Sequence, residues 1–215
     1  MIDTYRHKGL RVKLVETLRT KGITNEAILK AFIEIPRHYF LDKAFSDWAY
    51  RDVAFPIDSD QTISQPYTVA FQTTLLDVHK GDKILEIGTG SGFQACVLSY
   101  LGAKTYTIER QKALHDKTEK FLHSIGFDKI RTLFGDGYLG APRYAPYDKI
   151  LVTAGAMDIP SALIDQLKPG GILVIPHTEG DSQMMKRIVK QADSTLKTEL
   201  HGEFRFVPFL QGVNR

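Results

Sequence analysis

The stretch Leu85-Glu86-Ile87-Gly88-Thr89-Gly90-Ser91-Gly92 decides the fold of this 215-residue chain. Its apolar first half predicts a buried β-strand, and its glycines predict a tight turn into a helix beginning at Phe93. Glycines at such a turn accept positive φ angles and let a ligand approach the main chain closely. A phosphate-binding P-loop would end in Gly-Lys-Ser/Thr, which is absent here. A dinucleotide site is disfavoured because Phe93 occupies the place of its third glycine, and a tight turn without a ligand is the remaining alternative.

Strands and helices alternate in the part of the chain that contains this turn. Strands are predicted over Lys83–Ile87, Lys104–Ile108, Ile130–Phe134, Lys149–Thr153 and Gly171–Ile175. Helices are predicted over Phe93–Leu101, Gln111–Ile125 and Pro160–Leu167. Strands separated by helices need crossover connections, which predict an α/β fold with a doubly wound, mostly parallel sheet. The segment from Met185 to Val207 lacks a helical period and predicts antiparallel strands at one edge, for a sheet of seven strands.

The first 80 residues predict a helical extension. Leucines at helical spacing between Leu10 and Leu18 indicate one helix, and Asn25 is a plausible N-cap for a second that ends before Pro36. A long aromatic-rich segment, Arg37–Ser64, has no regular pattern. Loops of this length are usually functional or disordered, and its many aromatic residues indicate that it packs against the rest of the domain. We expect it to cover the active site and exclude water. Residues 1–215 are thus predicted to form one domain, with residues 1–80 covering the substrate and residues 81–215 forming the cofactor-binding core.

Composition excludes several classes of protein. The hydrophobic fraction of 43% and the charged fraction of 25% are typical of a globular protein, and a net charge of +3 without a basic run argues against nucleic acid. The seven histidines lack the spacing of metal ligands, so no metal is expected. A single cysteine, Cys96, allows no disulfide within the chain and favours the cytoplasm. No apolar run approaches the roughly 20 residues that span a bilayer.

Acidic residues follow two more of the predicted strands. Glu109 comes about twenty residues after Gly88, where a carboxylate can accept hydrogen bonds from ribose hydroxyls. Its alternative is a surface carboxylate paired with Arg110 or Lys112. Gly135-Asp136-Gly137 follows the next strand and is also a common turn sequence. Because the carboxyl ends of parallel strands share one edge of the sheet, these positions and the glycine turn are expected to meet in one binding site.

The spacing Gly-x-Gly-x-Gly, with Glu86 two positions before it, resembles motif I of the class I S-adenosylmethionine-dependent methyltransferases, whose fold is Rossmann-like. The resemblance implies that the loop wraps the amino acid part of S-adenosylmethionine and that Asp136 accepts a hydrogen bond from the adenine amino group. The cofactor-binding residues predicted in this way are Glu86, Gly88, Thr89, Gly90, Ser91, Gly92, Glu109, Gly135, Asp136 and Gly137.

A second segment is more specific. Gln61-Thr62-Ile63-Ser64-Gln65-Pro66-Tyr67 resembles the signature of the protein-L-isoaspartate O-methyltransferases, and the similarity extends from the first helix to about Gly212. It includes the segments Ile35-Pro36-Arg37, Gly135-Asp136-Gly137-Tyr138, Ala145-Pro146-Tyr147-Asp148, Val152-Thr153-Ala154, Gln166-Leu167, Pro169-Gly170-Gly171 and Arg205-Phe206-Val207-Pro208. The chain departs from the family at Phe93, Gly155 and Ala141, where Tyr, Ala and Trp are common.

This resemblance implies methyl transfer from S-adenosylmethionine to the free carboxylate of L-isoaspartyl residues in damaged proteins and peptides, followed by closure of the ester to a succinimide. A carboxylate is already ionised near pH 7, so the reaction needs alignment and exclusion of water rather than a base. Ser64 is the predicted catalytic residue, because its hydroxyl can orient the carboxylate with help from Thr62. Further substrate contacts are implied for Ile63, Gln65, Thr153 and Arg205.

Three alternatives stay open on sequence alone. Ser64 could instead be the N-cap of the helix that begins at Pro66. An enzyme that methylates nucleic-acid amines is disfavoured, since Asp/Asn-Pro-Pro-aromatic is expected where Val152-Thr153-Ala154-Gly155 stands. A binder that keeps the cofactor without turnover is opposed only by the presence of Ser64. We expect a monomer.

Overall fold

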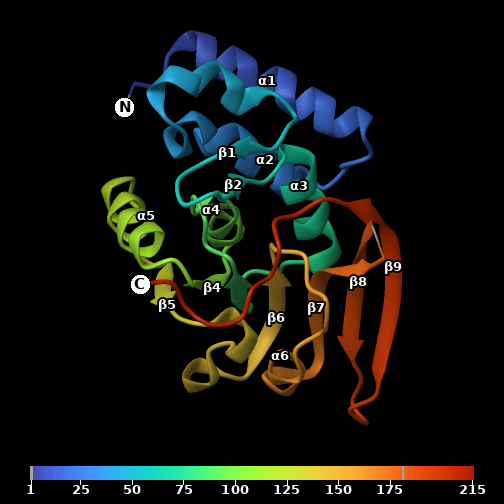
Figure 1. Ribbon diagram of the computed structural model, residues 1–215. Coiled ribbons are helices and arrows are strands. Elements are labelled where there is room, and N and C mark those ends of the chain that lie inside the picture. The colour runs from blue at the N-terminus through green and yellow to red at the C-terminus, as the bar shows by residue number, and fades with distance from the viewer. Residues whose placement is uncertain (1, 181) are drawn as a thin grey trace.

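The computed structural model describes residues 2–180 and 182–215, and Figure 1 shows their arrangement. The predicted seven-stranded, mostly parallel sheet is confirmed, with the strand order β5-β4-β3-β6-β7-β8-β9. The strands are β3 (Lys83–Ile87), β4 (Lys104–Glu109), β5 (Arg131–Phe134), β6 (Tyr147–Val152), β7 (Leu167–Glu179), β8 (Ser182–Lys190) and β9 (Leu196–Phe204). All pairs from β5 to β7 are parallel, whereas β8 pairs antiparallel with both β7 and β9. The last strands therefore follow chain order.

Helices cover the sheet on both faces. They are α3 (Pro66–Leu76), α4 (Phe93–Tyr100), α5 (Lys112–Ser124) and α6 (Ser161–Asp165), with 3₁₀ turns η3 (Gly137–Leu139) and η4 (Pro142–Tyr144). Successive residues of a strand point to opposite faces, so Ile84 packs with Leu98 of α4 while Leu85 packs with Leu163 of α6. This double burial explains why the strands read as continuous apolar runs. Cys96 is fully buried within α4.

The N-terminal region is helical, as predicted. It contains α1 (Tyr5–Thr20) and α2 (Glu26–Glu34), and the Asn25 side chain accepts from the main-chain N–H groups of Ala27 and Ile28, which confirms the predicted cap. The segment Arg37–Ser64, expected to be irregular, is more ordered than its sequence indicates. It forms η1 (Arg37–Phe40), η2 (Lys43–Tyr50) and a short hairpin of β1 (Phe55–Pro56) and β2 (Thr62–Ile63).

Aromatic packing gives this segment its order. Phe45 and Trp48 lie 4.9 and 5.9 Å from Phe55, measured between ring centroids. Phe40 lies 5.2 Å from Phe93 at the start of α4, in an edge-to-face arrangement. Each such pair adds about 0.5–1.5 kcal/mol to the burial of its rings. Because the rings are far apart in sequence, no local periodicity marks this structure in advance.

The N-terminal region lies at the edge of the sheet toward which β6 points, and the last residues cross the sheet to end beside β5 (Figure 1). The carboxyl ends of the parallel strands therefore lie beneath α1, α2 and the β1–β2 hairpin. None of the helices within residues 2–180 and 182–215 has the length and apolar character of a membrane span.

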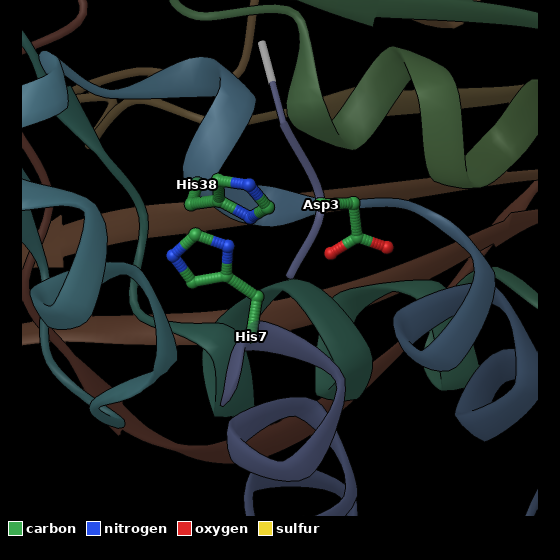
Figure 2. A group of neighbouring side chains, drawn as sticks. All are labelled: Asp3, His7 and His38. Carbon is green, nitrogen blue, oxygen red and sulfur yellow. The ribbon is translucent and has the colours of Figure 1, made fainter. Parts of the chain in front are cut away.

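A polar cluster fastens α1 to η1 (Figure 2). The imidazole rings of His7 and His38 stack at 3.8 Å, and Asp3 lies beside them. Both carboxylate oxygens of Asp3 accept from the Arg11 guanidinium, at 3.0 and 2.7 Å, and the His38 ring bonds the Tyr50 hydroxyl. These are the types of residue that bind metals, but both Asp3 oxygens and both His38 ring nitrogens already have hydrogen-bond partners within the protein. The cluster as it stands is a hydrogen-bonded clamp that holds the N-terminus on the segment after α2.

Candidate active site

A cleft opens at the carboxyl edge of the parallel strands. The chain continues from β3 to β4 and β5 on one side and returns to β6 on the other, so the strand order reverses at β3. Ligands of open α/β sheets bind at such a switch point. The cleft holds about 780 Å³ of space, part of it open to solvent. Eleven of the predicted site residues line it: Thr62, Ile63, Ser64, Glu86, Gly88, Thr89, Gly90, Ser91, Glu109, Gly137 and Thr153.

The glycine loop requires glycine at two positions, Gly88 and Gly92. Gly88 has a φ of +97°, and a Cβ there would lie 2.6 Å from the Thr153 hydroxyl oxygen. Gly92, the residue before α4, has a φ of +84°, and its Cβ would approach Thr118 and Leu122 to 3.0 Å. Side chains at these positions would add both backbone strain and a clash. The loop is thus packed tightly against the end of β6 and against α5. Its remaining side lines the cleft and is available to a ligand.

Thr153, a predicted substrate contact, has a structural role in this loop. Its hydroxyl donates to the main-chain oxygens of Ile87 and Gly88, at 2.9 and 3.0 Å. It therefore fixes the start of the loop to the end of β6. The Thr153 oxygen keeps lone pairs, but its proton is already engaged, so the contact with substrate stays a prediction.

Glu86 is a buried carboxyl whose oxygens accept no hydrogen bond from the described residues. Its side chain faces the α4 side of β3 and is fully inaccessible. Burial raises the pKa of Glu86 to about 8. The Thr107 hydroxyl close by opposes this shift, and the Glu109 carboxylate adds to it. A buried polar group without a partner costs about 1–3 kcal/mol. Such an arrangement suits a cationic ligand in the cleft.

Glu109 ends β4 with its carboxylate directed at the loop. One oxygen accepts from the main-chain N–H of Gly90 and the other from that of Gln111, both at 3.0 Å. The predicted alternative, a surface carboxylate paired with Arg110 or Lys112, is wrong because Glu109 is only 5% exposed and neither cation bonds it. Each carboxylate oxygen can accept a second bond, so Glu109 stays available to ribose hydroxyls.

Asp136 stands behind the cleft rather than in its wall. One of its oxygens accepts from the N–H of Tyr138 at 2.9 Å, and the other from the N–H of Gly212 at 2.7 Å. Gly92, Gly135 and Asp136 are the predicted cofactor residues that are absent from the cleft lining found for the described chain. A direct bond from Asp136 to adenine stays a prediction, and the two bonds present hold the chain terminus in place.

The C-terminal residues close one end of the cleft, which sequence analysis missed. Phe209 stacks on Tyr138 with 4.2 Å between ring centroids, and both Phe209 and Leu210 line the cleft. Asn214 then pairs with the chain at Gln111, through main-chain and side-chain bonds. The similarity that extends to about Gly212 was the only sign that this segment belongs to the site.

Ser64 is not a helix cap. The N-cap of α3 is Gln65, whose side chain caps no N–H group of the helix. The cap is supplied from a distance, because the Asp52 carboxylate accepts from the N–H of Tyr67 at 2.8 Å. Gln65, predicted to contact substrate, donates its amide to the same Asp52 at 3.0 and 3.1 Å. The capping alternative for Ser64 is therefore wrong, and its hydroxyl is left at the wall of the cleft.

A second depression adjoins the cleft at Ser64. It lies between α3 and the end of β9, and an aromatic stack of Tyr67, Phe71 and Phe204 forms part of its floor. Gln65 and Arg205, which do not line the cleft, line this groove instead. The residues that line both are Thr62, Ser64, Thr153 and Val207. Two binding spaces thus meet at one short wall that contains the predicted catalytic serine.

Comparison with known proteins agrees with this geometry. Residues 10–214 match the sequence model of the family described as protein-L-isoaspartate(D-aspartate) O-methyltransferase. Protein-L-isoaspartate O-methyltransferases from Christiangramia forsetii and Flavobacterium psychrophilum are each 55% identical to the chain over 214 residues, and each alignment covers all of both proteins.

Solved structures give the same result. One protein-L-isoaspartate O-methyltransferase superposes with a TM-score of 0.84 at 30% identity, over 92% of this chain, which spans 65% of that longer one. A Plasmodium falciparum structure assigned to the same activity, in complex with S-adenosyl-L-homocysteine, has a TM-score of 0.81 at 22% identity. It covers 95% of this chain and 98% of its own. The second likeness concerns the fold alone.

Proposed function

Because this chain belongs to the protein-L-isoaspartate O-methyltransferase family, we propose that the cleft holds its methyl donor, that the groove holds its damaged peptide, and that Ser64 orients the acceptor between them. The enzyme transfers a methyl group from S-adenosylmethionine to isoaspartyl residues, which begins their repair. The observation that carries the assignment of the two spaces is their shared wall, formed by Thr62, Ser64, Thr153 and Val207.

The residues of the cleft fit S-adenosylmethionine. When bound, this cofactor supplies an electrophilic methyl group on a sulfonium. The unpartnered Glu86 carboxyl provides a counter-charge for the cationic amino acid part of the cofactor, and the glycine loop allows that part to lie against the main chain. Glu109 has lone pairs left for the ribose hydroxyls.

The chain supplies position rather than acid–base chemistry. An isoaspartyl carboxylate is ionised at neutral pH and is itself the nucleophile. Ser64 has a hydroxyl that no capping bond occupies, and one donated hydrogen bond fixes the direction of a carboxylate oxygen. The β1–β2 hairpin lies over the same edge of the sheet, and Ile63 of β2 lines the cleft next to Ser64, where its apolar side chain helps to exclude water.

The substrate assignment is tested with two synthetic peptides of one sequence, containing either L-isoaspartate or normal aspartate at one position. We expect methyl transfer to the first and only background incorporation with the second, because the normal side-chain carboxylate cannot reach the donor from the same main-chain path. Incorporation of labelled methyl groups measures both rates. Equal rates on the two peptides, or transfer to nucleic-acid amines, would contradict the proposal.

The titration of Glu86 provides a second test. At pH 7 the carboxyl is mostly protonated, because burial raises its pKa to about 8. A cation bound beside it favours the ionised form, so binding should release a proton and strengthen as pH rises from 6 to 8, by up to about tenfold per unit. The variant Glu86→Gln should lose this dependence. Calorimetric titration of both proteins with S-adenosylmethionine at several pH values measures it, and identical pH profiles would exclude the contact.

We also propose that the enzyme is a cytoplasmic monomer. The one cysteine, Cys96, is a buried thiol whose pKa is raised by burial, which suits a reducing compartment.

A further inference from the structure

Arg37 lies directly behind the wall that contains Ser64. Its guanidinium donates from Nη2 to the main-chain oxygen of Ser64 at 2.8 Å and from Nε to the main-chain oxygen of Ala49 at 3.0 Å. Its Cζ atom lies 4.7 Å above the centroid of the Phe93 ring. Phe93 follows the glycine loop and lines the cleft. One side chain therefore contacts the acceptor segment, the covering segment and the first residue of α4.

The burial of the Arg37 guanidinium is unfavourable for the free energy of folding. Only 2% of the residue is exposed, and Nη1 has no hydrogen-bond partner among the described residues. Burial lowers the pKa of Arg37 to about 9, and the Asp52 carboxylate opposes this shift without bonding the guanidinium. That carboxylate is engaged by Lys21, Gln65 and Tyr67 instead. An apolar side chain in place of Arg37 would remove the cost of burying a charge, but it would also leave the main-chain oxygens of Ser64 and Ala49 without their hydrogen-bond donor. The guanidinium thus serves to hold these two main-chain oxygens at a fixed distance from each other, which apolar packing could not do.

We propose that Arg37 is a positioning residue for methyl transfer, which fixes the Ser64 main chain relative to the glycine loop and so sets the direction of the Ser64 hydroxyl. This inference rests on the proposed role of Ser64. The residue after Arg37 is His38, which the N-terminal clamp holds through Tyr50. The arginine is thereby anchored from both sides: its main chain by the clamp and its head group by two carbonyl oxygens and a ring.

The geometry requires arginine specifically. The two carbonyl oxygens lie on different segments, and a planar guanidinium reaches both while its face stacks on an aromatic ring. A lysine ammonium is a compact charge that lacks this planar face. Small displacements of a positioning group can cost about a hundredfold in rate, because the reacting atoms must be nearly aligned.

The test compares Arg37→Met and Arg37→Lys with the wild-type enzyme on an isoaspartyl peptide. We expect Arg37→Met to fold with a lower melting temperature because it loses two hydrogen bonds, to bind S-adenosylmethionine with the wild-type Kd, and to show a kcat about 10- to 100-fold lower. The kcat of Arg37→Lys should lie between those of the wild-type enzyme and Arg37→Met. Arg6→Met, on the exposed surface of α1, is the matched control and should behave as wild type.

A double-mutant cycle with Ser64→Ala separates positioning from scaffolding. If Arg37 acts through Ser64, the variant carrying both Arg37→Met and Ser64→Ala should lose no more kcat than the worse single variant. Losses that multiply would overturn the inference, as would an Arg37→Met kcat within about twofold of wild type. A fall in kcat matched by an equal fall in cofactor affinity would overturn it too.

If Arg37→Met does not fold, Arg37→Lys replaces it. The same kcat and affinity criteria then apply, and the double-mutant cycle combines Arg37→Lys with Ser64→Ala. The wild-type rates on isoaspartyl and aspartyl peptides are measured alongside. Absence of wild-type isoaspartyl activity would count against the proposed function, whereas normal wild-type activity with an unaffected Arg37 variant would count only against this inference.

Discussion

Replacing Ser64 by alanine should lower turnover on an isoaspartyl peptide by about ten- to a thousandfold, which corresponds to roughly 1.4–4 kcal/mol of activation free energy. Affinity for S-adenosylmethionine should be nearly unchanged, because the proposed donor contacts, the glycine loop, Glu86 and Glu109, come from other elements. The physical reason is the loss of one positioned donor at the junction of the two binding spaces.

Because Ser64 does not cap α3, a loss of helix capping cannot explain a lower activity of Ser64→Ala. A lost N-cap would cost about 1 kcal/mol, but the helix after Ser64 is capped by Asp52 and not by the serine. Ser64→Ala should therefore melt at the wild-type temperature. Ser99→Ala, at the far end of α4, is a matched control for the loss of a hydroxyl. Full turnover in Ser64→Ala would refute its role in orienting the carboxylate, whatever its melting temperature.

Replacing Glu109 by alanine should weaken binding of S-adenosylmethionine by roughly 1.5–3 kcal/mol, about 10- to 150-fold, because charge-assisted hydrogen bonds to the ribose are lost. Turnover at saturating cofactor should be affected less. Isothermal titration of the free enzyme with the cofactor measures the effect.

The same variant also removes two bonds inside the protein, since Glu109 accepts from the N–H groups of Gly90 and Gln111. Glu109→Gln distinguishes the two contributions, because an amide oxygen can still accept from Gly90 but carries no charge. Glu119→Ala serves as the control. It removes a carboxylate of α5 that accepts a hydrogen bond from the Thr132 hydroxyl of β5. Unchanged affinity in a folded Glu109→Ala protein would exclude the ribose contact.

The sequence by itself determined the parallel core, and it predicted the place of the cofactor. Strands buried on both faces are marked by continuous apolar runs, and the turn after β3 is marked by glycines that its φ angles require. The cap at Asn25 and the stop before Pro36 were equally readable. All of these are properties of residues close together in the chain, where backbone sterics and periodicity leave a local signature.

Only the tertiary structure decided how the acceptor side of the site is held. Asp52 caps a helix that begins fourteen positions later, Arg37 bonds the Ser64 main chain, and Gly212 bonds Asp136 across most of the core. Each contact joins residues with no common periodicity, so nothing in the local sequence marks the partners. Within the described residues Ser64 does not cap the helix, because the Asp52 carboxylate from another segment accepts from Tyr67 instead. This arrangement depends on packing that brings separate segments of the chain together.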